Sequence, residues 1–553
     1  MEPDPLDRLS LTMLCGKART TGIMHIPLRW LAALLITIAM LRIGATFRTF
    51  SATNDEASHV GAGLEIIQYH RYKLQRLNPP LPRLIMAAPP YVSGIRVAER
   101  GNFYEQVYSV FYNKRKYEDN LVSARVGNLV FLAIALSAVW LWARHELDER
   151  AGLLTLCIFS TQPIVLGYCG LATHDAAGAA GFAICLLAFG HWLRRPDTRR
   201  ALLFGLAYGF AISCKFSNIG YVCAACGFVL IWRLIDVPDG RKQLLLGFPR
   251  MLLLVLITSA VFVWASYGFT WGTVGDISDL KSAHGFFGAL ARQNPSLPLP
   301  APSFFDGLGQ LLELDRHGVE SYLFGKWSTT GWWWYFPTAL ALKTTLASLA
   351  LLGVGFVFVN RKPLLRRAFI ESMLAALAVL LVAMPSHLDI GVRYVLPVFA
   401  PLSVAAAASA CALFEHHRVW TRQAAVALLA LHLIVSVLAH PDYFPYFNAF
   451  AGKDPSRLFI DSNLDWGQDT LRLRHTARKL GVDHLTVSMP GLVDYGALGF
   501  PPIQLADAHK PVAGWIAISD HMYRMPQGER AWWWLDRRPF QRVGKTVRLF
   551  HIP

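Results

Sequence analysis

Charged residues are scarce in this sequence of 553 residues. They make up 16% of the chain, against 54% hydrophobic residues, whereas charged residues make up about 25% of a typical soluble protein. Up to residue 440 long polar stretches are few, and apolar runs of about 20 residues recur, which is the length that crosses a bilayer. This composition excludes a string of soluble domains and predicts a polytopic α-helical membrane protein.

Acidic residues are the scarcer of the two charged classes. The chain has 37 Asp and Glu residues against 53 Lys and Arg residues, a net charge of +16. Many of the basic residues lie in short loops between apolar runs, which is the pattern that orients a membrane protein. The charge is therefore attributed to contact with a lipid bilayer and not to nucleic acid, and it also suits an anionic lipid substrate.

Cysteines are few, and none of the eight lies in a large loop. This distribution excludes an extracytoplasmic disulfide framework. Cys223 and Cys226 form a CxxC pair, but the pair lies inside an apolar helix and no second pair accompanies it. We interpret both as small core residues. An internal sequence repeat, which is common in transporters, is also missing.

The apolar runs predict about 11 transmembrane helices. A polar cytoplasmic tail (1–25) without a cleavable signal pattern precedes the first span, which is typical of a signal anchor. The predicted spans within the membrane domain (26–440) are 26–47, 122–142, 151–168, 172–193, 201–217, 219–235, 244–268, 336–359, 368–385, 395–414 and 423–439.

Placing the N-terminus in the cytoplasm puts the short basic loops on the same side, as the positive-inside rule requires. Two large loops (49–120 and 270–335) and the C-terminal region (441–553) are then extracytoplasmic. We expect the C-terminal region to form a small α/β domain, with a helix over 466–480 that ends at Gly481. Its expected strands cover 459–460, 485–487, 515–518 and 547–550. The predicted location is the cytoplasmic (inner) membrane.

A helix start follows the first span. Thr53 and Glu56 have capping-box spacing, and apolar residues then recur at helical spacing at Val60, Leu64 and Ile67. The pattern predicts a short amphipathic helix along the membrane interface, with Asp55 and His59 on one face. The alternative for this stretch is an ordinary solvated helix start, where acids favour the positive end of the helix dipole.

Several ionisable residues fall at the same end of the predicted spans, where charges are costly and tend to mark a functional path. They are Asp55, Glu56, Asp175, Lys215, Lys343 and Arg393. Cations can hold the phosphate of a lipid-linked sugar while a carboxylate acts as general base on an incoming hydroxyl. A purely structural network of ion pairs is the alternative reading.

The order of the motifs resembles the GT-C superfamily of polyprenyl-phosphate-dependent glycosyltransferases, especially its protein O-mannosyltransferase-like and aminoarabinose-transferase-like members. The motifs are Asp55-Glu56, Asn78-Pro79-Pro80-Leu81, Thr173-His174-Asp175, Lys215-Phe216-Ser217 and Arg393-Tyr394-Val395-Leu396-Pro397. The stretch from Asp461 to Asp469 resembles bacterial family-39-like glycosyltransferases.

The resemblance implies inverting transfer of a sugar from a polyprenyl-phosphate donor to a hydroxyl of a protein, lipid or glycan on the extracytoplasmic face. It makes Asp55 the catalytic base, with Glu56 positioning the acceptor or the base. It also assigns the donor phosphate to Lys215, Arg393, Asp175 and Tyr394. The candidate acceptor or loop contacts are His59, Asn78, His174, Asp465 and Gln468. The alternative function is a flippase or transporter for lipid-linked sugars.

No cofactor is expected, and a divalent cation is doubtful. Related enzymes often carry a glutamate in the diproline motif, where this chain has Leu77-Asn78. The stretch Asp461-x-Asn463-x-Asp465 begins like a calcium loop, but Trp466 replaces the required glycine and Arg472 stands where the bidentate glutamate belongs. The stretch is better explained as a strand-to-helix turn with acids near the helix start. The alternative is that Trp466 and Gln468 face an acceptor substrate.

Overall fold

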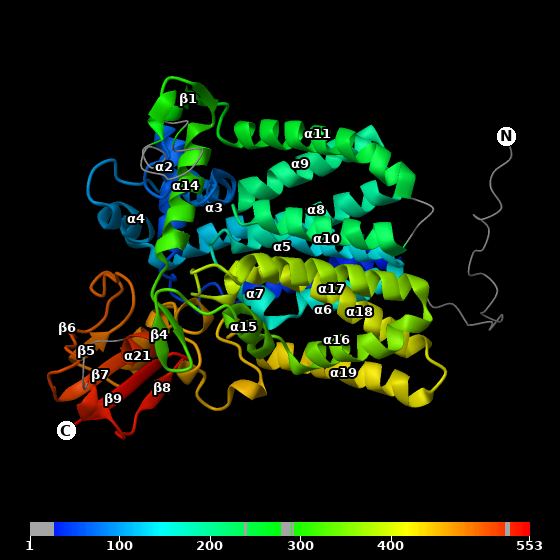
Figure 1. The fold of residues 1–553 in the computed structure, drawn as a ribbon. Helices are drawn as coiled ribbons and strands as arrows, with labels where there is room; N and C mark the ends of the chain where they lie inside the picture. Colours follow the sequence, from blue (N-terminus) through cyan, green and yellow to red (C-terminus); the bar gives the residue numbers. More distant parts are fainter. Residues whose placement is uncertain (1–26, 237–240, 278–288, 290–291, 526–530) are drawn as a thin grey trace.

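The computed structural model describes residues 27–236, 241–277, 289, 292–525 and 531–553. The predicted cytoplasmic tail lies outside the described residues. Helices dominate, and they run side by side in one bundle (Figure 1). The bundle consists of α1 (Leu28–Gly44), α5 (Tyr117–Glu146), α6 (Glu149–Ser160), α7 (Pro163–Cys169), α8 (Asp175–Arg194), α9 (Thr198–Cys214), α10 (Asn218–Asp236), α11 (Arg241–Ser266), α15 (Tyr335–Lys343), α16 (Leu346–Phe358), α17 (Pro363–Ala383), α18 (Phe399–Glu415) and α19 (Val419–Leu438).

Among the described residues, 6 helices are long and apolar enough to cross a membrane, or up to 8 when each bent pair counts as one span. The bent pairs are α6 with α7 (67°) and α15 with α16 (109°). Each predicted span coincides with a helix or a bent pair; the shorter α1 and α9 and the more polar α17 account for the remaining three. The chain is a multi-pass α-helical membrane protein, as its composition predicts.

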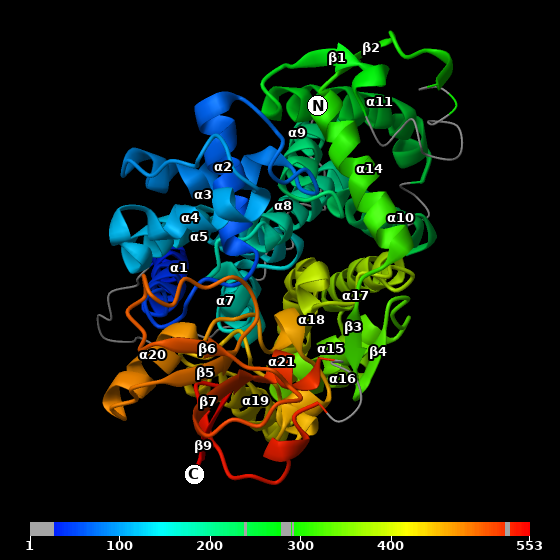
Figure 2. The ribbon, with the colours of Figure 1, turned by 90° about the vertical axis from the view of Figure 1, so that its left-hand side faces the viewer.

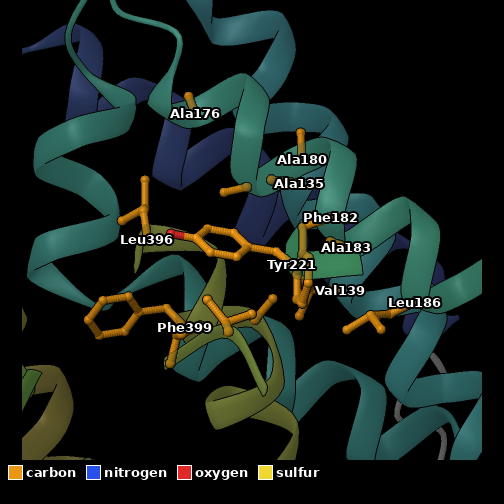
Figure 3. Packing of buried hydrophobic residues seen from close by; sticks show 14 of the residues in the cluster. Ala135, Val139, Ala176, Ala180, Phe182, Ala183, Leu186, Tyr221, Leu396 and Phe399 are labelled. Atoms are coloured by element: carbon orange, nitrogen blue, oxygen red, sulfur yellow. The ribbon is translucent and has the colours of Figure 1, made fainter. Parts of the chain in front are cut away.

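Small side chains allow the central helices to approach closely. Figure 3 shows Ala135 of α5 and Ala180 of α8 packed in the same cluster as Phe399 at the start of α18. A Cβ atom added at Gly181 would lie 2.6 Å from the Cα atom of Ala211 in α9. Dispersion contacts between closely packed backbones are what hold helices together in a bilayer.

A buried ionic network lies at the end of the bundle that carries the short basic turns. Arg233 of α10 donates to both carboxylate oxygens of Glu371 in α17, and its Nη2 lies 3.4 Å from Glu146 at the end of α5. An ion pair of 3.2 Å between Lys362 Nζ and Glu415 Oε2 connects the turns that follow α16 and α18. These contacts bring the basic turns together at one end of the bundle (Figure 1).

The opposite end carries the long loops. Helices α2 (Glu56–Tyr69), α3 (Pro80–Val92) and α4 (Phe103–Tyr112) form one group there, and α14 (Pro302–His317) lies across from them (Figure 2). Two short hairpins, β1 (Trp271–Thr273) with β2 (Pro298–Pro300) and β3 (Ser321–Leu323) with β4 (Lys326–Ser328), flank α14 in the chain. Pro79 is extended and Pro80 is the first residue of α3, so the diproline both breaks the preceding chain and starts a helix.

Helix α2 differs from its prediction in one respect. The helix is present, but both its faces are buried, so it does not lie along the interface with one face in solvent. The backbone of α3 packs so closely on α2 that a Cβ atom at Gly63 would lie 2.2 Å from the Arg83 carbonyl oxygen. Even the charged Glu65 of this helix is buried, and it accepts from the backbone N–H groups of Lys73 and Leu74.

The C-terminal region contains a sheet of strand order β6-β5-β7-β9-β8. Strand β5 (Leu485–Ser488) runs parallel to β6 (Ile503–Leu505) and β7 (Gly514–Ser519), whereas β9 (Val547–Ile552) runs antiparallel to β7 and β8 (Gln541–Val543). Helix α20 (Thr470–Lys479) is shorter than predicted, and Gly481 follows it with φ of 63°. The strand predicted at 459–460 is wrong, because this apolar pair packs against the helical bundle, with Phe459 5.3 Å from the Tyr335 ring.

One buried histidine joins the two bent spans. His432 of α19 contacts the Thr345 hydroxyl, at the bend between α15 and α16, at 2.8 Å through Nδ1. Its Nε2 lies 2.9 Å from the Thr161 hydroxyl, at the bend between α6 and α7. A bend in a transmembrane helix leaves polar groups without their usual hydrogen-bond partners, and the bilayer offers no water to replace them. His432 provides a hydrogen-bond partner to a hydroxyl group at each of the two bends.

We predict that His432→Leu lowers the stability of the purified protein, because it removes the hydrogen bonds of this ring to hydroxyl groups at both bends. Each lost hydrogen bond costs about 0.5–1.5 kcal/mol. Thermal unfolding in detergent measures the effect, with the exposed His417 changed to leucine as the matched control. Equal unfolding temperatures for the two variants would contradict the assigned role.

Candidate functional site

Four charged side chains form a continuous chain at the end of the bundle that carries the long loops. Arg393 Nη1 donates to Asp55 Oδ2 at 2.7 Å, and Lys215 Nζ donates to Asp175 Oδ1 at 2.7 Å. Arg393 Nη1 also lies 3.9 Å from Asp175 Oδ2, which joins the two pairs. The structure therefore brings together the four residues that the sequence predicts to share a site.

Each of these residues lies where a helix begins or ends. Asp55 immediately precedes α2, Asp175 is the first residue of α8, and Lys215 follows α9 in an extended conformation. Arg393 lies in the 3-10 helix η6 (Val392–Val398) that leads into α18. The side chain of Asp55 makes no capping bond to its own helix, so its carboxylate is free to face Arg393.

Exposure distinguishes Asp55 from the other three residues. Its side chain is 36% exposed, whereas those of Arg393 and Lys215 are 6% exposed and that of Asp175 is fully buried. A molecule approaching from the long loops can therefore reach one carboxylate of the chain and not the other. The Thr173 hydroxyl donates to Asp175 Oδ2 at 3.0 Å and fixes the buried acid.

Two aromatic rings lie over the cations. The Tyr394 ring lies 5.1 Å from Lys215 Nζ and 5.3 Å from the Arg393 guanidinium. Trp466, from the C-terminal region, lies 4.3 Å from the same guanidinium. The sequence does not predict this contact of Trp466, because nothing in the local pattern brings residue 466 beside residue 393. Such cation–π contacts favour a desolvated arginine.

Buried polar atoms near the charged chain have no partner among the described residues. They include Nε of Arg393, Nδ1 of His59 and the hydroxyl of Ser217. The Nε2 atom of His59 lies 3.2 Å from Nδ1 of His174. Burial lowers the pKa of His59 to about 4, so its ring is neutral at physiological pH. Buried polar atoms without a partner beside four charged side chains are suited to contact a ligand.

Glu56 has a different environment from Asp55, although the two are adjacent in sequence. Its carboxylate receives two hydrogen bonds of 2.8 Å from Arg125 in α5 and one of 2.8 Å from the Ala172 N–H. It also accepts from the Thr53 N–H, which is one half of the predicted capping box. Glu56 is fully buried and its oxygens are occupied, so its position suits anchoring of the loop before α2.

Arg125 is the main residue that sequence analysis missed. Its guanidinium also donates to the carbonyl oxygens of Phe47, Phe50 and Ser51, so it fixes the loop on which Asp55 lies. A single arginine inside a predicted span was the available signal, because such a charge needs a buried partner. The adjacent acids Asp55 and Glu56 offered two candidates for that partner.

The remaining residues that the sequence predicts for the site make hydrogen bonds that involve backbone groups of loops. Lys343 donates to the carbonyl oxygens of Phe444 and Asn463, away from the charged chain. Asp465 accepts from the His521 N–H at 2.7 Å, and burial raises the pKa of its carboxyl to about 6. Gln468 bonds within its own turn, to the backbone of Leu464 and Trp466. The carbonyl oxygen of Asn78 accepts from Arg83.

Within the described ranges, no group of three or more His, Cys, Asp or Glu side chains is arranged to hold a metal ion. In the stretch that begins like a calcium loop, Asn463 accepts from the Val392 N–H and donates to the Tyr335 hydroxyl. The donor set therefore does not suit a calcium ion.

Comparison with known families gives a match over part of the chain. Residues 117–265 match the family model described as dolichyl-phosphate-mannose-protein mannosyltransferase. This segment includes Asp175 and Lys215 of the charged chain. A search of curated proteins finds no significant match.

Comparison with solved structures gives similar folds at low identity. The Pmt1-Pmt2 protein O-mannosyltransferase complex of S. cerevisiae, bound to its sugar donor, has a TM-score of 0.51 and 12% identity over 87% of this chain and 94% of that chain. ArnT from Cupriavidus metallidurans, bound to undecaprenyl phosphate, has a TM-score of 0.47 and 14% identity over 95% of this chain and 98% of that chain. The archaeal oligosaccharyltransferase AglB from Archaeoglobus fulgidus has a TM-score of 0.45 and 14% identity over 89% and 70%.

We predict that Glu56 and Arg125 are strongly coupled in stability. Either Glu56→Gln or Arg125→Met alone leaves a buried group without its counter-charge, which costs about 3–5 kcal/mol, whereas the double variant loses less than the sum. Unfolding in detergent of the wild type, both single variants and the double variant measures the coupling.

The exposed pair Arg48 and Asp119 is the matched control for this cycle, with side chains 61% and 58% exposed. Its coupling should be at most about 1 kcal/mol. Additive losses at Glu56 and Arg125 would show that their contact does not anchor the loop.

Proposed function

We propose that this chain, a membrane protein with the GT-C fold and a segment similar to mannosyltransferases, transfers a sugar from a polyprenyl-phosphate donor to a hydroxyl acceptor. The observation that carries the proposal is the half-exposed carboxylate of Asp55 paired with the buried Arg393. It supplies a base next to a cation that can hold a phosphate.

Asp55 acts as the general base in this proposal. Its carboxylate takes the proton of the acceptor hydroxyl while that oxygen attacks the anomeric carbon of the donor sugar. The bond between the anomeric carbon and the phosphate oxygen breaks, and the electron pair leaves with the polyprenyl phosphate. Attack from the face opposite the leaving phosphate inverts the anomeric configuration. The hydrogen bond from Arg393 holds one oxygen of the Asp55 carboxylate in place.

Lys215 and Arg393 hold the donor phosphate. The unpaired Nε of Arg393 is available to a phosphate oxygen, since the Nη1 of the same fork already bonds Asp55. Asp175 keeps Lys215 in place, and Tyr394 covers both cations. The developing negative charge on the leaving phosphate is then met by fixed cations in a site poor in water, where such interactions are strongest.

The proposed orientation follows from the two ends of the bundle. The end with the short basic turns suits the cytoplasm, and the end with Asp55, the long loops and the C-terminal region suits the extracytoplasmic face. In this orientation His59 lies near Asp55 on the side proposed for the acceptor, and His174 contacts His59. Glu56 anchors the loop that carries the base instead of taking part in the proton transfer.

We predict that Asp55→Asn lowers the rate of sugar transfer by about 10²–10⁴-fold, because the amide keeps the shape of the side chain but cannot accept a proton. Transfer of label from radiolabelled polyprenyl-phosphate sugars in membranes measures the effect. Asp119→Asn, a change at an exposed ion-paired aspartate, is the control and should retain activity. Full activity of Asp55→Asn in folded protein would disprove the assignment, and lipid flipping without transfer by the wild type would favour a transporter.

We also predict that removing the buried pair, Asp175→Asn with Lys215→Met, lowers the affinity for the donor by about tenfold or more. The double change leaves no unpaired charge behind, so the fold should survive while one phosphate contact is lost. Binding of polyprenyl phosphate to purified protein tests this. The exposed pair, Asp119→Asn with Arg48→Met, is the matched control, and unchanged affinity in the Asp175 and Lys215 variant would remove Lys215 from the phosphate site.

A further inference from the structure

A second cavity lies away from the charged chain, between the end of α19 and the C-terminal region. It has a volume of about 680 Å³, within the range of sites that hold small molecules and head groups. One wall comes from the last turns of α19, including Val435 and Leu438, and the other from the C-terminal region, including Lys453, Arg542 and Lys545. The cavity is thus apolar at one side and charged at the other.

The apolar side is continuous with the surface that faces the bilayer. Leu438, which lines the cavity, is 76% exposed, and its neighbour Val437 is 65% exposed. Phe450, next to the lining residue Ala449, is 72% exposed. In a membrane protein, large apolar side chains so exposed at a helix end contact acyl chains, so the cavity opens sideways to lipid.

The acids that line the cavity are neutralised by arginines. Asp442 pairs with Arg472 at 2.6 Å, and Asp520 pairs with Arg548 at 2.6 Å and also with Arg542. A third acid is paired in the same way: Asp454 lies 3.3 Å from Arg524. The carboxylates therefore contribute little net charge to the cavity.

Two lysines on the rim are not neutralised. The ammonium groups of Lys453 and Lys545 have no ion pair or hydrogen bond with any residue in the described part of the chain, and both side chains are exposed. The half-buried Tyr446 lies in the same wall as Lys453. An apolar floor open to the bilayer below two free cations complements a molecule with a hydrocarbon tail and an anionic head.

We propose that this cavity binds an anionic phospholipid of the surrounding bilayer, with its acyl chains along the end of α19 and its phosphate at the rim that carries Lys453 and Lys545. The volume accommodates a head group and the first methylene groups of the tails, which continue into the bilayer. The site is separate from the donor site and does not depend on the proposed transfer. Leu464 lines the cavity and Trp466, two residues further, covers Arg393, so the bound lipid supports the loop that reaches the charged chain.

Native mass spectrometry of the full-length protein in detergent tests the proposal, with dioleoyl phosphatidylglycerol, dioleoyl phosphatidylcholine and a polyprenyl phosphate as separate probes. In the double variant Lys453→Glu with Lys545→Glu, we expect the apparent affinity for phosphatidylglycerol to fall by about tenfold or more. Binding of phosphatidylcholine should not change. The exposed lysines Lys479 and Lys510, changed together to glutamate, form the matched control.

Ala449→Trp is the second variant, because it fills the cavity and leaves the lysines in place. It should also lower phosphatidylglycerol binding. Unchanged phosphatidylglycerol binding in both variants would overturn the proposal, and so would a selective loss of polyprenyl phosphate binding. The readout is binding, so failure of the proposed transfer reaction would leave this result unaffected.

Discussion

The need to give each buried charge a counter-charge or hydrogen-bond partners governs the architecture of this protein. A lone ion inside the bundle would cost several kcal/mol, whereas a pair with good geometry can be accommodated. Arg393 meets two carboxylates, Asp55 and Asp175, and the second of these also holds Lys215. These contacts fix the positions of η6, α8, α9 and the loop before α2 relative to one another. The half-exposed Asp55 is the residue of this network that is accessible from the long loops.

The adjacent acids Asp55 and Glu56 have different partners and different exposure. Asp55 faces Arg393 and remains accessible, whereas Glu56 is fully buried against Arg125. A helix start naturally sends successive side chains in different directions, so one residue can anchor a loop while its neighbour faces a ligand. The rigidity that Glu56 gives to the loop suits the role proposed for Asp55, since a general base must be held at a fixed distance from the reacting hydroxyl.

The helical membrane fold and most of the charged residues of the site can be predicted from the sequence, because a charge within an apolar run is easily identified. Asp175, Lys215 and Arg393 could be assigned to one end of the bundle from the order of spans alone, and the helical membrane fold follows from the apolar runs. The burial of α2 could not be predicted, because the covering helices α3 and α4 come later in the chain and leave no mark on its own pattern. For the same reason Lys343 looked like a member of the charged chain, although it binds carbonyl oxygens of the C-terminal region. The apolar pair at 459–460 looked like a strand because packing on a membrane bundle and pairing in a sheet favour the same side chains.

The contact of Trp466 with Arg393 has a consequence for biosynthesis. The charged chain is nearly complete once η6 has been made, but the face of Arg393 is covered only when a loop close to the C-terminus has folded against it. During translation the helices enter the membrane first, and the residues after α19 follow. The site is therefore completed in two stages, because the contact of Trp466 with Arg393 forms only after the residues that follow α19 have been made. The finished geometry of the site thus depends on the last part of the polypeptide, although the four charged residues all come earlier in the chain.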